Sequence, residues 1–233
     1  MATYTLETSS IAAQIQAALQ HLDRHDFSTA LWERRLDVWP DDPQVRRVVA
    51  NRLGWLDAPD IAPQQLTRLE TFAAQVRASG LTDVMLFGMG GSSLVGEVLN
   101  RSFGRVHASP RFHMLDSTDP DAVRPLVADA ATSLFIVASK SGSTIEPNAM
   151  AAAARRAVEL SGIKTWGGHF VAITDEATEL HQRAANDGYL DIFVNPTDVG
   201  GRYSALTYFG LVPAALLGIC LLYTSPSPRD VEE

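Results

Sequence analysis

The chain has 233 residues, which is enough for one substantial α/β domain with a helical extension or for two small domains. Hydrophobic residues make up 46% of it and charged residues 20%, as in an ordinary globular protein with a buried core. The net charge of −8 argues against a nucleic-acid-binding or anionic-membrane surface, and the single cysteine, Cys220, excludes an intrachain disulfide.

The N-terminal part of the chain carries helix-forming sequence. Residues 1–14 lack a basic region followed by an apolar run, so no secretory signal is present in them and a cytoplasmic location is expected. Residues 9–26 have the periodicity of an amphipathic helix, and residues 31–55, broken by prolines, are predicted to form short helices. A further helix is predicted over residues 62–80, with Leu66, Leu69, Ala73 and Val76 facing inward. We expect residues 1–80 to form a helical extension that packs on the core.

From residue 82 onward, short apolar strands alternate with helices. The predicted strands are residues 83–88, 111–115, 133–138, 169–174 and 190–194. The predicted helices are residues 92–103, 119–128, 145–161 and 176–187, with a last helix from Tyr203. This alternation is typical of a parallel sheet covered on both faces, so residues 81–219 are expected to form a three-layer α/β/α sandwich with a five-stranded parallel sheet.

Residues 205–222 are the most apolar stretch and reach the lower length limit for a membrane span. They contain Tyr208, Pro213 and two glycines, and they follow a glycine-rich turn. We therefore expect a buried helix here and no membrane contact.

A glycine-rich loop follows the first predicted strand. Residues 88–93 read GMGGSS and precede a helix, so their backbone N–H groups can close on an oxyanion at the positive end of that helix. The loop also invites comparison with the dinucleotide-binding fingerprint. Ser93 stands where the third glycine of that fingerprint belongs, but Asp116 ends the second strand, where a ribose-binding acid would lie. A tight strand-to-helix turn without any ligand needs the same glycines.

A second loop of small polar residues follows the third predicted strand. Residues 139–144 read SKSGST and place four hydroxyls and one lysine directly before a helix. A phosphate monoester uses such donors directly, whereas a nucleotide fold does not require them at its third strand. The alternative is a helix capped by Thr144 with Lys140 on the surface, which explains one hydroxyl but not the cluster. Because both loops follow parallel strands, they are predicted to form a receptor for one phosphate group at the same sheet edge.

A third glycine-rich segment lies near the end of the pattern. Residues 198–204 read DVGGRYS, in which paired glycines allow close backbone approach. Arg202 can hold its delocalised charge against an oxyanion that develops in a transition state. The alternative is a glycine turn whose arginine bonds helix carbonyls. The six histidines show no metal-ligand spacing, so no metal is expected.

These segments, in this order and spacing, resemble glucose-6-phosphate isomerase, a family whose subdomains have the sugar isomerase (SIS) fold. Residues 88–92 look like the family's first phosphate loop, residues 139–144 like its second, and residues 200–204 like its signature segment. The segments that look especially like the isomerase part of transaldolase–isomerase fusion proteins are residues 51–56 and 115–120. The resemblance covers about residues 30–219.

The resemblance implies that the chain binds a hexose phosphate. The residues that it assigns to the substrate phosphate are Gly91, Ser92, Ser139, Lys140, Ser141 and Thr144. Arg202, with the backbone of Gly201, would stabilise the enediolate formed as a proton moves between C2 and C1 of glucose 6-phosphate and fructose 6-phosphate. The second loop departs from the commoner version at residues 142–143 and at Pro147, where the family has bulkier or hydroxylated residues.

The family reaction also needs a carboxylate base, assisted by a histidine and a lysine. In the family these groups lie beyond the signature segment, in a second subdomain, so we expect this chain to bind the sugar phosphate without isomerising it. The resemblance further implies no cofactor, no nucleic-acid partner, and a full-length protein that is dimeric or fused to transaldolase. The open alternatives are a non-catalytic phosphosugar sensor of the same fold and a nucleotide-binding domain.

The C-terminal residues 220–233 fit neither the helical period nor the family continuation. Residues 220–230 look like the translation of a sequencing adapter joined to a truncated gene. We expect the authentic sequence to end near Ile219 and the tail to be non-native; its proline and serine content also suits a disordered tail.

Overall fold

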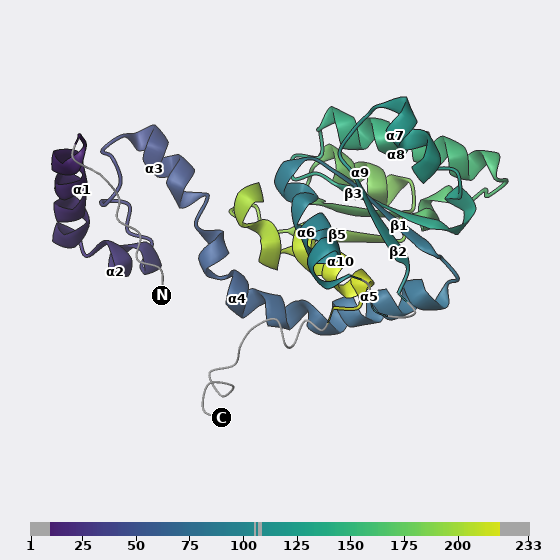
Figure 1. Cartoon of the computed structure of the whole chain (residues 1–233), viewed down its shortest axis with the longest axis horizontal. Helices are drawn as coiled ribbons and strands as arrows, with labels where there is room; N and C mark the ends of the chain where they lie inside the picture. Colours follow the sequence, from purple (N-terminus) through teal and green to yellow (C-terminus); the bar gives the residue numbers. More distant parts are fainter. Residues whose placement is uncertain (1–9, 105, 107–108, 220–233) are drawn as a thin grey trace, which may run out of the picture.

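The computed structural model describes residues 10–104, 106 and 109–219 (Figure 1). The tail predicted over residues 220–233, and Cys220 within it, lie outside the described residues and stay predictions.

Five parallel strands form a single sheet in the order β2-β1-β3-β4-β5. The strands are β1 (Asp83–Gly88), β2 (Arg111–Leu115), β3 (Ser133–Ala138), β4 (Phe170–Asp175) and β5 (Asp191–Asn195). The first three have the predicted bounds, and β4 and β5 begin one residue later than predicted. Short apolar runs between helices locate buried parallel strands well because both faces of such strands are covered.

Helices cover both faces of the sheet (Figure 1). The helices on one face are α5 (Leu66–Ala78), α6 (Leu94–Phe103) and α10 (Tyr208–Leu217), and those on the other are α7 (Pro120–Leu126), α8 (Ile145–Leu160) and α9 (Glu179–Asn186). Side chains alternate along each strand, so Leu86 and Ile136 face the first layer while Phe87 and Phe135 face the second. The predicted three-layer α/β/α sandwich is confirmed.

The last helix begins later than predicted. Residues Gly201–Leu206 form a 3₁₀ turn, η6, and Thr207 then caps α10 by accepting a hydrogen bond from the Phe209 N–H (3.4 Å). All ten residues of α10 are buried, as predicted for this apolar stretch. Over the described part of the chain, no helix combines the length and the apolar character that a membrane span requires.

The N-terminal helices lie at one end of the molecule, away from the sheet (Figure 1). They are α1 (Ala12–Arg24), α2 (Phe27–Trp32) and α3 (Pro43–Ala50), and the short α4 (Ala58–Ile61) leads from them to α5. The packing differs from the expected helical extension: α5 lies on the sheet with Leu69, Phe72 and Val76 buried, whereas α1 has no buried residue. The periodicity of α1 indicated which face is apolar but not what covers that face.

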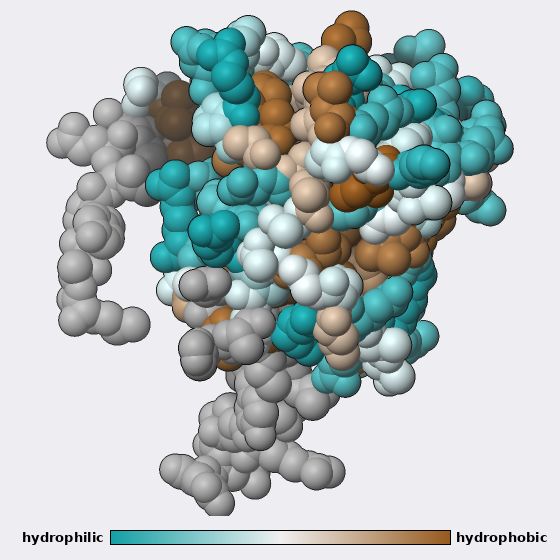
Figure 2. Space-filling model, turned by 90° about the vertical axis from the view of Figure 1, so that its right-hand side faces the viewer, coloured by the Kyte–Doolittle hydropathy of each residue, from teal (hydrophilic) through white to brown (hydrophobic). Residues whose placement is uncertain are grey.

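The opposite end of the molecule is shown in Figure 2, where hydrophobic residues reach the surface among hydrophilic ones.

A buried carboxylate lies at the amino-terminal edge of the sheet, at the start of β1. Asp83 accepts two hydrogen bonds from Arg111 (2.8 and 2.6 Å) and one from Thr82 (2.8 Å), and His113 Nε2 lies 3.2 Å from it. Both carboxylate oxygens are therefore satisfied, although only 3% of the side chain is exposed.

Acid should remove the contribution of this cluster to stability. Burial raises the pKa of Asp83, but the hydrogen bonds from Arg111, Thr82 and His113 together outweigh it and hold the pKa below its ordinary value. A carboxylate with a lowered folded-state pKa stabilises the fold above its unfolded pKa, about 3.9, and loses this effect as the pH falls through the folded value. We expect Asp83→Asn to lower the free energy of unfolding at neutral pH by about 1–3 kcal/mol, and by less in acid.

Urea unfolding of both proteins at neutral and acidic pH measures this difference. Asp121→Asn is the control, because the ion pair of Asp121 with Arg124 is exposed and should contribute about 0.5 kcal/mol or less. An Asp83→Asn deficit that stays constant down to pH values below the unfolded pKa would contradict the assignment.

Candidate functional site

The first two polar loops leave neighbouring strands at the carboxyl edge of the sheet. Gly88, the last residue of β1, is in register with Ala138, the last residue of β3. Because β2 lies on the other side of β1, the chain diverges between β1 and β3, and this point is a topological switch of the kind where α/β sheets bind ligands. The sequence predicted both loops at this edge.

The first and third loops touch through their backbones. Gly91 lies in the turn η3 (Gly90–Ser92), and a Cβ placed on it would lie 2.1 Å from the carbonyl oxygen of Gly201. The buried hydroxyl of Ser204 shares its single proton between the carbonyl oxygens of Gly91 (3.1 Å) and Gly201 (2.7 Å). Two predicted site residues that are far apart in the sequence are therefore in contact, and Ser204 holds them there.

Hydroxyl groups organise the second loop internally. Ser139 Oγ, which is buried, accepts a hydrogen bond from the Gly142 N–H (3.1 Å) and lies 3.0 Å from Thr144 Oγ1. Ser141 is exposed, and its Oγ accepts from the N–H (3.3 Å) and the hydroxyl (3.1 Å) of Ser143. The structure thus brings Ser139, Ser141 and Thr144 together at the start of α8.

The alternative in which the Thr144 side chain caps α8 is wrong. Thr144 occupies the N-cap position of α8, but its side chain makes no capping hydrogen bond. Its hydroxyl faces Ser139 instead. The helix is 16 residues long, and Thr144 does not cap its N-terminal N–H groups.

Lys140 does not extend freely from the second loop. Its ammonium group lies 2.5 Å from Asp175 Oδ2 and donates to the carbonyl oxygen of Thr197 (2.9 Å). The lysine therefore links the second loop to the end of β4 and to the segment that leads into the third loop. Sequence reasoning missed Asp175; the available signal was an acidic residue at the carboxyl end of a predicted strand, on the same edge as both loops.

The electrostatics of Asp175 differ from those of Asp83. Burial raises the pKa of Asp175, and the hydrogen bond and charge of Lys140, with the more distant charge of Arg52, offset this only in part. One carboxylate oxygen, Oδ1, is buried without a hydrogen-bond partner among the described residues. This carboxylate is thus less well satisfied than Asp83 at the opposite edge.

The arginine of the third loop is exposed. Among the residues that the structure describes, no ion pair or side-chain hydrogen bond holds the Arg202 guanidinium, which contradicts the alternative in which it bonds helix carbonyls. The loop itself is fixed: the Tyr203 ring stacks on Trp55 with centroids 5.6 Å apart, and the Gly54 N–H donates to the carbonyl oxygen of Asp198 (3.2 Å). Residues 51–56 therefore support this loop, a role that sequence reasoning did not assign to them.

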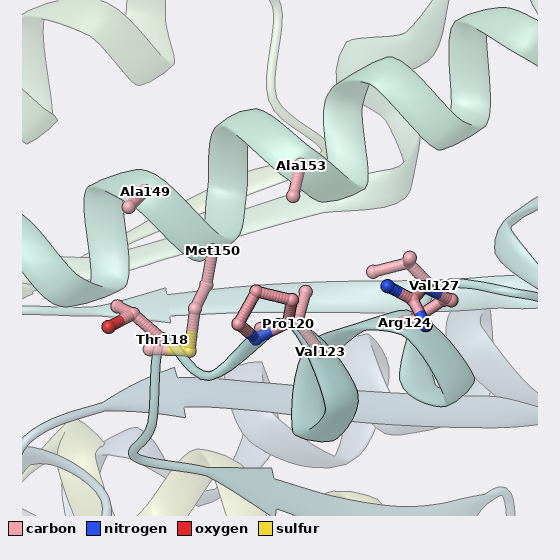
Figure 3. Close-up of a pocket in the computed structure, with 8 residues that line it drawn as sticks. All are labelled: Thr118, Pro120, Val123, Arg124, Val127, Ala149, Met150 and Ala153. Carbon is pink, nitrogen blue, oxygen red and sulfur yellow. The ribbon is translucent and has the colours of Figure 1, made fainter.

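A separate cavity of about 330 Å³ lies between α7 and α8 (Figure 3). In it Met150 extends from α8 toward Pro120 and Thr118, and the remaining walls are largely apolar. It contains none of the predicted site residues and has no convergent anion donors. Within the described ranges, no group of three or more acidic, histidine or cysteine side chains is arranged to hold a metal ion.

The phosphoglucose isomerase family model matches residues 58–221. The chain belongs to this family. It is 34% identical over 186 residues to a glucose-6-phosphate isomerase of Synechococcus sp. (strain JA-2-3B'a(2-13)), an alignment covering 71% of this chain and 35% of that protein. It is 33% identical over 199 residues to the glucose-6-phosphate isomerase of Citrifermentans bemidjiense, covering 76% and 37%. The chain therefore spans about a third of the length of these curated relatives.

Two solved structures share the fold of this chain. The chain superposes on a hypothetical protein from Thermus thermophilus with a TM-score of 0.64 and 31% identity, covering 85% of this chain and 46% of that one. It superposes on a glucose-6-phosphate isomerase from Chlamydia trachomatis with a TM-score of 0.59 and 25% identity, covering 83% and 35%.

Proposed function

We propose that this chain is the sugar-phosphate-binding part of a glucose-6-phosphate isomerase. One observation carries the proposal: the backbone contact between Gly91 and Gly201 joins the first and third loops beside the second loop at the switch point. Three loops with anion-binding chemistry at one sheet edge suit a ligand that has a phosphate at one end and a reacting centre at the other.

In this proposal the phosphate is bound by neutral donors. Its site is formed by Gly91, Ser92, Ser139, Lys140, Ser141 and Thr144, with Lys140 contributing the backbone N–H of the second loop. The positive end of α8 adds to the attraction. The exposed Arg202 and the Gly201 backbone then face the sugar, where they stabilise negative charge on the enediolate in the complete enzyme. The carboxylate base belongs to the part of the relatives that this chain does not span.

Calorimetric titration with glucose 6-phosphate, fructose 6-phosphate and NAD tests the proposal on this chain. We expect both hexose phosphates to bind and NAD to give no heat, and we expect no interconversion of the two sugars above background. NAD binding without hexose phosphate binding supports the nucleotide-binding alternative and contradicts the proposal.

Removing two donors of the second loop should weaken binding of glucose 6-phosphate strongly. Each hydrogen bond to a charged phosphate contributes about 1.5–3 kcal/mol, so Ser141→Ala with Thr144→Val should lower the affinity by at least about 100-fold. The matched control is Ser161→Ala with Thr165→Val, which removes the same residue types near the other end of α8. Equal affinity in the two double variants would place the phosphate elsewhere.

A further inference from the structure

The lysine of the second loop is already paired with a carboxylate. Lys140 Nζ lies 2.5 Å from Asp175 Oδ2, and the two side chains are only 26% and 12% exposed. Its remaining described contact is with the Thr197 carbonyl oxygen. An anion that reaches the second loop therefore meets a lysine whose charge is balanced.

The backbone builds this pair into the sheet edge. Lys140 follows β3 and Asp175 ends β4, and these two strands are neighbours. The Asp175 N–H donates to the Lys140 carbonyl oxygen (3.3 Å), while the Ser139 N–H donates to the Ile173 carbonyl oxygen (3.0 Å). The two side chains therefore leave backbones that hydrogen bonds hold side by side.

The surroundings of Asp175 in the fold do not favour a charged carboxylate. Asp175 Oδ1 is buried and unpartnered among the described residues, and burial raises the pKa of the group. Because the folded-state pKa of Asp175 is raised, its ionisation is less favourable in the folded protein than in the unfolded chain, and any stabilising effect of the group is lost as the pH rises through the folded value. Groups that are unfavourable for stability and lie beside a binding site are candidates for a functional role.

We propose that Asp175 sets the anion affinity and selectivity of the phosphate site by holding Lys140 in an ion pair, so that the lysine charge is withheld from the ligand. The inference rests on the proposed function. The site then recognises a phosphate monoester of a neutral sugar by directed hydrogen bonds rather than by net positive charge. Such a site discriminates against ligands that offer only charge.

Asp175→Asn tests this role, because the amide keeps the shape of the side chain and removes its charge. We expect glucose 6-phosphate to bind about tenfold more tightly to this variant at low salt, because Lys140 regains an unbalanced charge near the phosphate. The gain should shrink at high sodium chloride, where screening weakens the new attraction. Inorganic phosphate, which offers charge without a sugar, should gain at least as much as glucose 6-phosphate.

Two controls isolate the ion pair. Glu176→Gln removes a negative charge from the next, exposed residue without touching Lys140, and it should change the affinity about twofold or less. In a Lys140→Met background, Asp175→Asn should tighten binding by much less than about tenfold, because there is no lysine charge to release. Asp175→Ser removes the charge in a second way and replaces Asp175→Asn if that variant does not fold.

The outcomes separate this inference from the function on which it rests. If the native chain binds glucose 6-phosphate and both Asp175→Asn and Asp175→Ser bind it no more tightly than the native chain does, the role of Asp175 is wrong. The proposed function stays intact in that case. The role of Asp175 is also wrong if Glu176→Gln raises the affinity as much as Asp175→Asn does. The same holds if Asp175→Asn raises the affinity just as much in the Lys140→Met background. If no protein of the series binds either phosphate compound, both the proposed function and this inference are wrong.

Discussion

Replacing Gly91 with alanine is expected to abolish sugar-phosphate binding and to lower the free energy of unfolding by about 1–3 kcal/mol. The added Cβ would lie 2.1 Å from the carbonyl oxygen and 2.4 Å from the carbonyl carbon of Gly201. Both are backbone atoms, so relief of the clash requires the first and third loops to separate. The hydrogen bonds that Ser204 donates to both carbonyls would weaken at the same time.

Chemical denaturation and calorimetric titration with glucose 6-phosphate measure the two effects of Gly91→Ala. Gly168→Ala is the matched control, since no atom lies within 4 Å of its added Cβ and its backbone suits any residue. The control should stay within about 0.5 kcal/mol of the native protein and bind normally. Normal binding by Gly91→Ala would show that the contact between these loops is not needed for the site.

Among single substitutions at the site, Gly142→Ala should have the second largest effect on binding. Gly142 has a φ of +70°, and its added Cβ would lie 2.7 Å from the Thr178 Cβ and 2.9 Å from the Leu180 nitrogen. The loop must shift, which breaks the hydrogen bond from the Gly142 N–H to Ser139 Oγ. We expect a loss of about 2–4 kcal/mol in stability, from left-handed strain and overpacking together, and an affinity lower by about 100-fold.

Gly162→Ala shows the effect of backbone strain at a positive φ without a steric clash of the added Cβ. Gly162 also has a positive φ, +89°, but no atom lies within 4 Å of its added Cβ. The Gly162→Ala variant should lose about 1 kcal/mol of unfolding free energy from backbone strain alone. It should keep normal affinity for glucose 6-phosphate, because Gly162 lies after α8, away from the second loop. Thermal unfolding and titration of both variants provide the comparison, and similar losses in the two would contradict the contact argument.

Local pattern predicted the sheet well. Apolar runs bounded by helices predicted every strand to within one residue, and glycine and serine clusters after β1 and β3 predicted which sheet edge carries the polar loops. The beginning of α10 was less predictable, since Gly201–Leu206 is compatible with both a 3₁₀ turn and an α-helix by composition. The alternative in which Thr144 caps α8 was wrong because the hydroxyl of Thr144 lies against Ser139 Oγ in the same loop.

The local sequence pattern did not predict contacts between segments that lie far apart in the chain. Nothing in the local sequence distinguishes Asp175 from other acidic residues that end a strand, because its partner is set by the order of β3 and β4 in the sheet. The stack of Trp55 on Tyr203 has the same origin. Hydrophobic periodicity likewise marks the apolar face of α1 but carries no information on its contacts.

The contact held by Ser204 has a consequence for how the chain folds. Ser204 and Gly91 are 113 positions apart in the sequence, and β2, β3, β4 and β5 all lie between them. Loop closure over such a distance is entropically unfavourable until intervening strands have paired. The first and second loops can therefore adopt their local shapes early, while the contact between the first and third loops forms only at the end of folding. A ligand that bridges the first and third loops stabilises the finished sheet and not its precursors.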